Sequence, residues 1–588
     1  MRGGDETGEE IYVSGAVEVK LRLISDFNLG TLENCLANDA PFPLALSSAP
    51  FGQVMPGLLA GPPGPTDFAL VWTLPEKVLS SFAAALEGRA IDEAQLFGEI
   101  HDFCEGLRAA RKQYRAIFVA SWTLPHYWRG NGILSLGRQG LRRLLIKSNL
   151  RLAEELEENT GIYLLDAQPW IEAAGKDAYS PKLWYLAKTP FHAEVFRRAA
   201  CDVRAAISAV TGGPRKLLIV DLDNTLWGGV VGDAGWQDLR IGGHDYLGEA
   251  FLDFQRGLQA LRRRGILLAI VSKNDESVAM EAIGSHPEMV LRVQDFIGWR
   301  INWKDKAANI AELAAELKLG LESIVFIDDN PVERARVGEA LPEVLVPEWP
   351  DDKTLSASRL LELDCFDSAY PAPEDASRHE LYAAGKQREQ SRPVKSSEEE
   401  WLLSLGTEAT VEAVDESNRL RVIQLLNKTN QMNLATRRLT ESELQSWLQS
   451  AERAMWAFRM KDRFGDSGII GIVSVETDGD VARVSDFVLS CRVMGRKLES
   501  AMLAFAAEWA AARGCREVQL NYVPTPRNAP CMTFLMAAGL KRAQNTFTWP
   551  LTEMYPFPQA IRVEGRNMIG QLTPVSKADT PLPVAAAG

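Results

Sequence analysis

The stretch that decides the fold is Leu217-Leu218-Ile219-Val220-Asp221-Leu222-Asp223-Asn224-Thr225-Leu226-Trp227. Its first four residues are apolar and β-favouring, which predicts a short strand buried on both faces. Asp221 and Asp223 follow at once, so both carboxylates are expected at the end of that strand. Ligands of open parallel sheets bind at the carboxyl ends of the strands. Two carboxylates aimed at one point are costly unless a cation neutralises them, and oxygen ligands suit Mg²⁺.

Further polar side chains stand where predicted strands end or a predicted helix begins. They are Ser272, Lys273 and Asn274 after the strand expected over 266–271, Lys306 at the start of a helix expected over 306–317, and Asp328 and Asp329 after the strand expected over 323–327. Neighbouring parallel strands end at the same edge of a sheet, so these side chains are expected around one pocket. The set suits phosphoryl transfer, because one carboxylate can attack, another can exchange a proton, and the cations offset phosphate charge.

Composition and charge exclude several classes of protein. The 588 residues exceed what one hydrophobic core usually supports, so two to four domains are expected. A net charge of −14 argues against nucleic acid as the main partner. No apolar stretch approaches the roughly 18 residues of a membrane span, and the N-terminus lacks the apolar core of a secretory signal. The seven cysteines form no CxxC pair, which favours reduced thiols and a cytoplasmic location.

Three domains and a tail are expected. Residues 1–210 alternate β-like and amphipathic helical runs, the pattern of a parallel α/β sheet. The turn-forming sequence Thr211-Gly212-Gly213-Pro214 marks the boundary to a second alternating segment, 211–385. After a polar linker, residues 401–555 mix predicted strands with a long helix in a separate α+β or α/β domain. The composition of 563–588 predicts a disordered tail.

The motifs of the middle segment resemble a known superfamily. Asp221-x-Asp223-x-Thr225, Ser272, Lys306 and Asp328-Asp329 match, in order, the four motifs of the haloacid dehalogenase-like (HAD) superfamily. The resemblance implies a HAD-like Rossmannoid parallel sheet, with Asp221 as the nucleophile that forms an aspartyl-phosphate and Asp223 as general acid and base. The implied site residues are Thr225, Ser272, Lys273 and Asn274 for phosphate binding, Lys306 for charge neutralisation, and Asp221, Asp223, Asp328 and Asp329 for Mg²⁺.

Longer stretches resemble a narrower family, the FkbH-like proteins. The resemblance covers nearly the whole chain up to about residue 555. It implies that a 1,3-bisphosphoglycerate donor loses its phosphates and that the glyceryl group reaches the phosphopantetheine thiol of an acyl carrier protein, in polyketide and related biosynthesis. The stretches are DNTLWGGVVG (223–232), SKN (272–274), DDNPVE (328–333), NKTNQMNL (427–434), DRFGD (462–466) and SCRVMGR (490–496).

The thiol step of that reaction has one candidate residue. FkbH-like enzymes are thought to carry the glyceryl group on a cysteine, and many have it in the strand before the DxDxT motif. Here that strand, 216–220, has no cysteine. Cys491 is the remaining candidate, because Arg492 and Arg496 nearby favour a thiolate. The alternative is that Cys491 is a small buried residue at a strand end.

The flanking segments carry weaker resemblances. Residues 401–555 resemble a GNAT-type acyltransferase, and the helix start from Arg492 to Lys497 is similar to the loop that cradles a coenzyme A pyrophosphate. The second glycine of that loop is absent, so the loop, with Arg492 and Arg496, is expected to dock a phosphopantetheine arm or a carrier protein. The alternative is a purely structural domain. The first segment has the alternation of SGNH-type hydrolases, with Ser25-Asp26-Phe27-Asn28 at the nucleophile position. His192 lacks an acid three residues before it, so an inactive SGNH-like domain is expected.

Three functions are compatible with these features. The first is an FkbH-like enzyme that loads a glyceryl or related hydroxyacyl group from a small phosphorylated donor onto a carrier protein. The second is a stand-alone HAD phosphatase on a small phosphorylated metabolite. The third is a non-catalytic scaffold that docks a carrier protein, and intact acids at Asp221, Asp223 and Asp329 argue against it.

Overall fold

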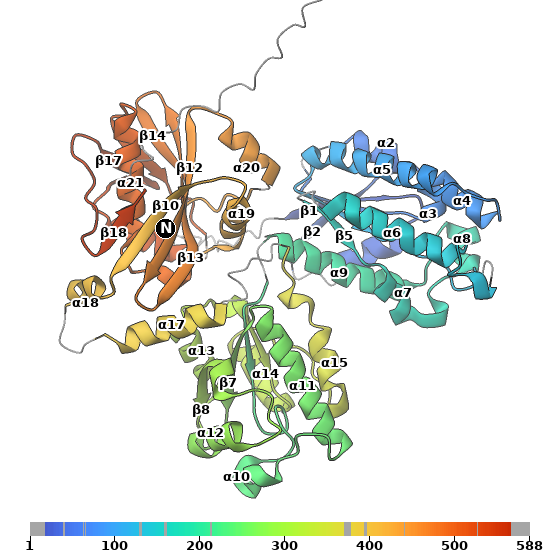
Figure 1. Cartoon of the computed structure of the whole chain (residues 1–588), viewed down its shortest axis with the longest axis horizontal. Helices are drawn as coiled ribbons and strands as arrows, with labels where there is room; N and C mark the ends of the chain where they lie inside the picture. The colour runs from blue at the N-terminus through green and yellow to red at the C-terminus, as the bar shows by residue number, and fades with distance from the viewer. Residues whose placement is uncertain are drawn as a thin grey trace, which may run out of the picture. The chain divides into compact units, whose positions relative to one another are not determined.

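The computed structural model describes residues 18–38, 42–62, 64, 66–128, 132–157, 161–211, 214–369, 378–392, 397–439, 441–525 and 527–565. The chain forms two compact units, residues 1–208 and 209–588, which are described separately. The second unit contains two sheets, one in the middle domain and one in the third (Figure 1). Within the described residues, no helix combines the length and the apolar character needed to span a membrane.

The first unit is a parallel α/β domain. Its five strands run in the order β2-β1-β3-β4-β5, and every pair is parallel. Edge strand β2 is half-buried and lacks the continuous apolar run of its neighbours. The sequence pattern therefore does not predict it. The strands are β1 (Val19–Ser25), β2 (Leu44–Ser48), β3 (Phe68–Trp72), β4 (Ala116–Ala120) and β5 (Ile162–Leu165).

Helices of the first unit pack on both faces of its sheet (Figure 1). Apolar side chains of α5 and α6 join those of the strands in one core. A cluster of aromatic side chains forms another, in which Trp72 contacts Trp170, Phe191 and Phe196. The helices are α1 (Gly30–Asn38), α2 (Val54–Leu59), α3 (Pro75–Val78), α4 (Ser80–Leu86), α5 (Glu93–Ala110), α6 (Leu141–Glu157), α7 (Gln168–Ala174), α8 (Pro181–Ala187) and α9 (Ala193–Thr211).

The middle domain is a four-stranded parallel sheet in the order β8-β7-β6-β9. The strand predicted from 217 to 220 is central, and its side chains are buried on both faces: Leu218 and Val220 join one core, and Leu217 and Ile219 the other. The elements are β6 (Leu217–Val220), α10 (Val231–Ala234), α11 (Tyr246–Arg263), β7 (Leu267–Ser272), α12 (Glu276–Ser285), β8 (Phe296–Ile301), α13 (Lys306–Glu316), β9 (Ile324–Ile327), α14 (Pro331–Ala340) and α15 (Ser356–Leu361).

The third domain is α+β. Its mixed sheet has the order β16-β17-β15-β14-β13-β12-β10-β18, with β11 paired to β14, around the buried helix α21. The elements are α17 (Arg378–Gln390) and α18 (Glu398–Ser404) in the predicted linker, then β10 (Thr407–Ala413), α19 (Arg419–Lys428), β11 (Met432–Asn433), α20 (Glu441–Leu448), β12 (Arg453–Asp462), β13 (Gly465–Asp478), β14 (Val481–Leu489), α21 (Leu498–Ala512), β15 (Glu517–Asn521), α22 (Ala529–Ala537), β16 (Lys541–Ala543), β17 (Thr546–Pro550) and β18 (Ile561–Glu564).

The end of the third domain differs from the expected boundary at residue 555. Strand β18 pairs in parallel with β10, with Thr407 opposite Ile561 and Thr410 opposite Glu564. The first residues of the predicted tail are therefore part of a strand, because their backbone completes the edge of the sheet. The rest of that tail, 566–588, lies outside the described residues.

Candidate active site

Strand register brings the acidic residues together. β6 and β9 are parallel neighbours with Val220 opposite Ile327, so the next residues, Asp221 and Asp328, emerge side by side. The backbone N–H of Asp221 continues the ladder by donating to the carbonyl of Ile327 at 3.0 Å. A pocket of about 430 Å³ opens at this edge. It is lined by Asp221, Asp223, Asn224, Ser272, Lys273, Lys306, Asp328, Asp329, Asn330, Pro331 and Glu333.

Lys306 lies between two buried carboxylates. Its Nζ is 3.0 Å from Asp221 Oδ1 and 2.6 Å from Asp328 Oδ2, and the three side chains are at most 9% exposed. Burial raises the pKa of Asp221, although Lys306 opposes the shift. Burial and the Asp221 carboxylate raise the pKa of Asp328 to about 6. Burial alone would lower the pKa of Lys306, but the two carboxylates outweigh it and the pKa is raised.

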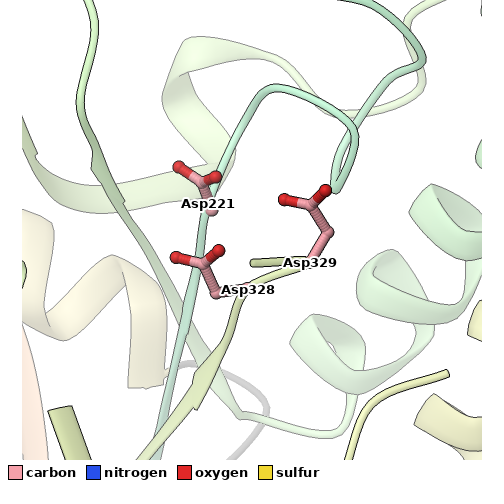
Figure 2. Close-up of side chains that lie close together, drawn as sticks. All are labelled: Asp221, Asp328 and Asp329. Carbon is pink, nitrogen blue, oxygen red and sulfur yellow. The ribbon is translucent and has the colours of Figure 1, made fainter. Parts of the chain in front are cut away.

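Three carboxylates form a group that fits a divalent cation (Figure 2). Asp221, Asp328 and Asp329 each offer an oxygen, and these oxygens lie within 4.8 Å of one another. Among the described residues, two lysines pair with them, Lys306 and Lys353, the latter 3.3 Å from Asp329 Oδ2, so two ammonium groups face three carboxyl groups. Asp221 Oδ1 is buried and lies beside the Lys306 ammonium group. An all-oxygen donor set of three carboxylates suits Mg²⁺.

Asp223 lies outside this group, contrary to the expectation that its carboxylate shares the metal. Both of its oxygens are used as hydrogen-bond acceptors: Oδ1 accepts from Trp227 Nε1 at 2.8 Å and from the Val231 N–H at 3.1 Å, and Oδ2 accepts from Asn274 Nδ2 at 2.8 Å. Burial raises the pKa of Asp223, so this carboxyl holds a proton more readily than an exposed aspartate does. The side chain is thus held at the pocket wall as a proton donor and acceptor.

The four predicted phosphate-binding residues take different positions. Ser272 lines the pocket and hydrogen-bonds Asp221. Lys273 lines it too, with its Nζ 2.6 Å from Glu333. Thr225 does not line the pocket but stabilises it, because its hydroxyl accepts a hydrogen bond from the Asp329 N–H at 3.0 Å. Asn274 likewise acts through its hydrogen bond to Asp223.

Two further residues, Lys353 and Asn224, contribute to the site without a role predicted from the sequence. Lys353 reaches Asp329 from a short 3₁₀ helix, Lys353–Leu355, that follows the sheet by more than twenty residues. Asn224 holds the turn after β6: its φ is +55°, a conformation that favours Asn and Gly, and its Oδ1 accepts from the Gly229 N–H at 3.0 Å. An asparagine inside a DxDxT motif is a usable signal for such a turn, whereas the contact of Lys353 depends on tertiary structure alone.

Asn274 should position the proton-transferring carboxyl. Removing its hydrogen bond to Asp223 by Asn274→Ala is expected to lower kcat by roughly 10- to 100-fold, the value of one hydrogen bond to a charged group. The acid limb of the pH–rate profile should move with it, a change that a purely structural role would not cause. Asn302→Ala, which removes an amide pair with Asn309, is the control. An unchanged kcat and profile for Asn274→Ala would contradict the assignment.

The structure does not bring Cys491 to this pocket. Cys491 lines a different cavity, together with Lys216 and Ser323, which stand at the amino ends of β6 and β9. Asp221 follows the carboxyl end of β6, five residues further on, about 16 Å along the strand. The Tyr382 hydroxyl is 3.8 Å from Cys491 Sγ. In this arrangement, no group can therefore pass directly from Asp221 to Cys491.

Arg492 and Arg496, like Cys491, do not line the pocket of Asp221. Arg492 lines the cavity of Cys491. Arg496 is buried and pairs with Asp462, which also binds Arg388 at 2.6 Å. Burial lowers the pKa of Arg496 to about 10, with Asp462 acting against the shift. Its guanidinium therefore lies in a buried ion-pair cluster and, unlike Arg492, does not line the cavity of Cys491.

One solved structure that contains a phosphatase domain matches more than half of this chain. The solved N-terminal part of the protein BF1531 from Bacteroides fragilis, described as containing a phosphatase domain complexed with Mg, is similar to this chain with 26% identity and a TM-score of 0.54. The match covers 60% of this chain and 94% of that one. No protein-family model matches this chain, and no curated protein matches it either.

Acetyltransferase structures match a smaller part of the chain. The ribosomal-protein-S18-alanine N-acetyltransferase from Escherichia coli is 11% identical, with a TM-score of 0.20, over 24% of this chain and 94% of that one. A GNAT-family acetyltransferase from Staphylococcus aureus Mu50 is 9% identical, with a TM-score of 0.19, over 24% and 99%. The GNAT-like and SGNH-like assignments stay predictions. The middle domain has the HAD-like fold that its motifs predict, with the acid cluster of a phosphatase.

Proposed function

We propose that this chain is a Mg²⁺-dependent phosphatase of the HAD type that acts on a phosphate monoester. The observation that carries the proposal is the buried Asp221 carboxylate, held 3.0 Å from Lys306 at the mouth of the pocket with Asp328 and Asp329 beside it. Mg²⁺, held by these three aspartates, would offset phosphate charge. Lys306 would stabilise the charge that develops on the transferred phosphoryl group.

The residues support a two-step reaction. An Asp221 oxygen attacks phosphorus, the bond from phosphorus to the substrate oxygen breaks, and the Asp223 carboxyl gives that oxygen its proton. Asp223, now ionised, takes a proton from water, which attacks the aspartyl-phosphate and releases inorganic phosphate while the Asp221 carboxylate re-forms. The raised pKa of Asp223 suits the first step, and its hydrogen bonds to Trp227 and Asn274 fix its orientation.

The finer proposal is glyceryl loading in the cytoplasm, as in the FkbH-like proteins. The 3-phosphate of 1,3-bisphosphoglycerate is a monoester of the kind that Asp221 would cleave. Its 1-phosphate is an acyl phosphate, so a thiolate can attack the carbonyl carbon and displace phosphate. The acceptor would be the phosphopantetheine thiol of an acyl carrier protein, directly or after transfer from Cys491.

The cavity of Cys491 supports this second step. Its lining is rich in cationic side chains, and an anionic phosphate ester would bind there more readily than a neutral molecule. Because the cavity lies at the opposite end of β6 from Asp221, dephosphorylation and acyl transfer would be separate events. The lining includes Glu322, which is acidic, and Lys216, whose pKa is lowered by burial, and the other basic residues are Lys318, Arg378, Arg421, Lys428 and Arg492.

Intact-protein mass spectrometry tests the function. The chain is incubated with Mg²⁺ and 1,3-bisphosphoglycerate, with and without a phosphopantetheinylated carrier protein. A glyceryl increment that moves to the carrier is the expected result. Phosphate release without an increment on either protein would leave the alternative, a stand-alone phosphatase on a small phosphorylated metabolite, which the Asp221 site alone suffices to explain.

Cys491→Ser should separate the two activities. The variant is expected to release phosphate from a monoester at the wild-type rate, because Cys491 is remote from Asp221, and to load the carrier at least tenfold more slowly, because serine is a far weaker nucleophile at neutral pH. Cys201→Ser, which changes an exposed thiol of the first unit, is the control. Unimpaired loading by Cys491→Ser would remove the covalent role from Cys491.

A further inference from the structure

A third pocket lies wholly within the first unit. It has a volume of about 720 Å³, within the usual range for small-molecule sites. Asp26 stands at its wall directly after β1, and helices α2, α3 and α5 and the end of α8 provide the rest. The lining residues are Asp26, Phe51, Gly52, Val54, Met55, Pro56, Lys77, Val78, Glu99, Asp102, Phe103, Trp184 and Lys188.

Asp26 stands where this sheet reverses its strand order. β1 lies between β2 and β3, so the chain leaves β1 toward one edge and returns on its other side. Ligands of open α/β sheets bind in the crevice at such a point, beyond the carboxyl ends of the strands. Asp26 spans the two strands, because its Oδ2 accepts from the Leu74 N–H, just after β3, at 2.9 Å.

The second oxygen of Asp26 is not used by the fold. Oδ1 is buried and has no hydrogen-bond partner among the described residues. Burial raises the pKa of this carboxyl to about 7. Native structures rarely leave a buried carboxylate oxygen unpaired, so the arrangement serves something other than stability. Ser25, expected at the nucleophile position, is buried, and its hydroxyl accepts from the Phe27 N–H at 3.1 Å.

The lining selects for an uncharged ligand. Lys77 and Lys188 carry positive charge, and Glu99 and Asp102, with Asp26 when ionised, carry negative charge, so neither sign of ligand is favoured. Glu99 is also occupied by the hydroxyls of Ser80 and Ser81. The remaining walls are apolar or aromatic. They are formed by Phe51, Val54, Met55, Pro56, Val78, Phe103 and Trp184.

We propose that this pocket binds a small uncharged molecule that has an apolar body and one polar group placed against Asp26 Oδ1. The apolar body lies along the wall that includes Phe51 and Phe103, and the polar group completes the hydrogen bonding of Asp26. The site is separate from the phosphatase pocket and does not depend on the function proposed for Asp221.

The polar preference of the site should change with pH. Protonated Asp26 donates to a carbonyl, whereas ionised Asp26 accepts only. The charged groups that face it are Glu76 and Lys77 from α3, Glu99 and Asp102 from α5, and Lys188 after α8. Binding of a ligand that can only accept is therefore expected to weaken as the pH rises through about 7.

Saturation-transfer NMR on the full chain tests this with 2-hexanone, which accepts but does not donate. Its affinity should fall by about tenfold from pH 6 to pH 8. Hexanoate and hexylamine, matched in length but charged, should bind more weakly than 2-hexanone at pH 6. In Asp26→Asn the Leu74 N–H still donates its hydrogen bond to the side-chain oxygen. The amide nitrogen therefore takes the Oδ1 position and donates at every pH. Binding of 2-hexanone to this variant should be independent of pH.

Phe51→Ala and Leu59→Ala form a matched pair. Both side chains are about half exposed, at 53% and 50%, but only Phe51 lines the pocket. Phe51→Ala should weaken 2-hexanone binding severalfold, and Leu59→Ala should leave it unchanged. Equal effects of the two, an unchanged affinity of the wild type between pH 6 and pH 8, or no saturation transfer to any probe would overturn the proposal.

Discussion

Asp221→Asn is expected to lower phosphate release by at least about 10⁴-fold, the usual effect of removing a nucleophile. The amide cannot form an aspartyl-phosphate, although it nearly reproduces the shape of the carboxyl group. The fold should be retained and its thermal stability equal or higher, because a buried carboxyl whose pKa is raised by burial is replaced by a neutral group. Phosphate release from p-nitrophenyl phosphate and 3-phosphoglycerate, together with thermal unfolding, measures both effects.

The control for this variant is the same change elsewhere in the middle domain. Asp233 is exposed on α10 and does not line the pocket, so Asp233→Asn should keep wild-type activity. Trapping with acid after brief incubation with a labelled monoester should give phosphoprotein for the wild type and for Asp233→Asn only. Release by Asp221→Asn within tenfold of the wild-type rate would refute the role of Asp221.

Much of this site could be predicted because its parts follow strand ends. An apolar run such as 217–220 predicts a buried strand, and in a parallel sheet the residue after each strand faces the same crevice. Asp221, Asp328 and Ser272 were placed by this rule alone. The same rule predicts Asp223 as a metal ligand, but it does not predict the hydrogen bonds that its oxygens accept from Trp227 and Asn274, which belong to a turn and a neighbouring loop.

Other features depend on tertiary structure that the sequence pattern does not encode. Edge strand β2 (LALSS) has no pronounced period, since both of its faces are half-buried. The position of Cys491 could not be predicted from its basic neighbours, because charged residues near a thiol in the sequence do not indicate which end of β6 the thiol lies at. Arg496 shows the same limit: its charge suggested a ligand, but Asp462 and Arg388 hold it in a buried cluster.

Lys306→Met is expected to impair both activity and stability. Lys306 is the only ammonium group in contact with both Asp221 and Asp328 among the described residues, and its side chain is 4% exposed. Its removal leaves two buried carboxylates without a counter-charge, which should lower the free energy of unfolding by about 3–5 kcal/mol. Phosphate release should fall by roughly 10²- to 10³-fold, the effect of losing one electrostatic contact to the transition state.

Lys353→Met provides the comparison that separates burial from charge. Lys353 also contacts a carboxylate of the group, Asp329, but at 3.3 Å and with 21% of its side chain exposed. Solvent already screens that pair, so its loss should cost less than about 1 kcal/mol of stability. Adding Mg²⁺ should raise the unfolding temperature of Lys306→Met more than that of the wild type, because the cation restores positive charge beside Asp221 and Asp328. Equal destabilisation by the two substitutions, or no extra gain from Mg²⁺, would show that Lys306 does not neutralise the buried acids.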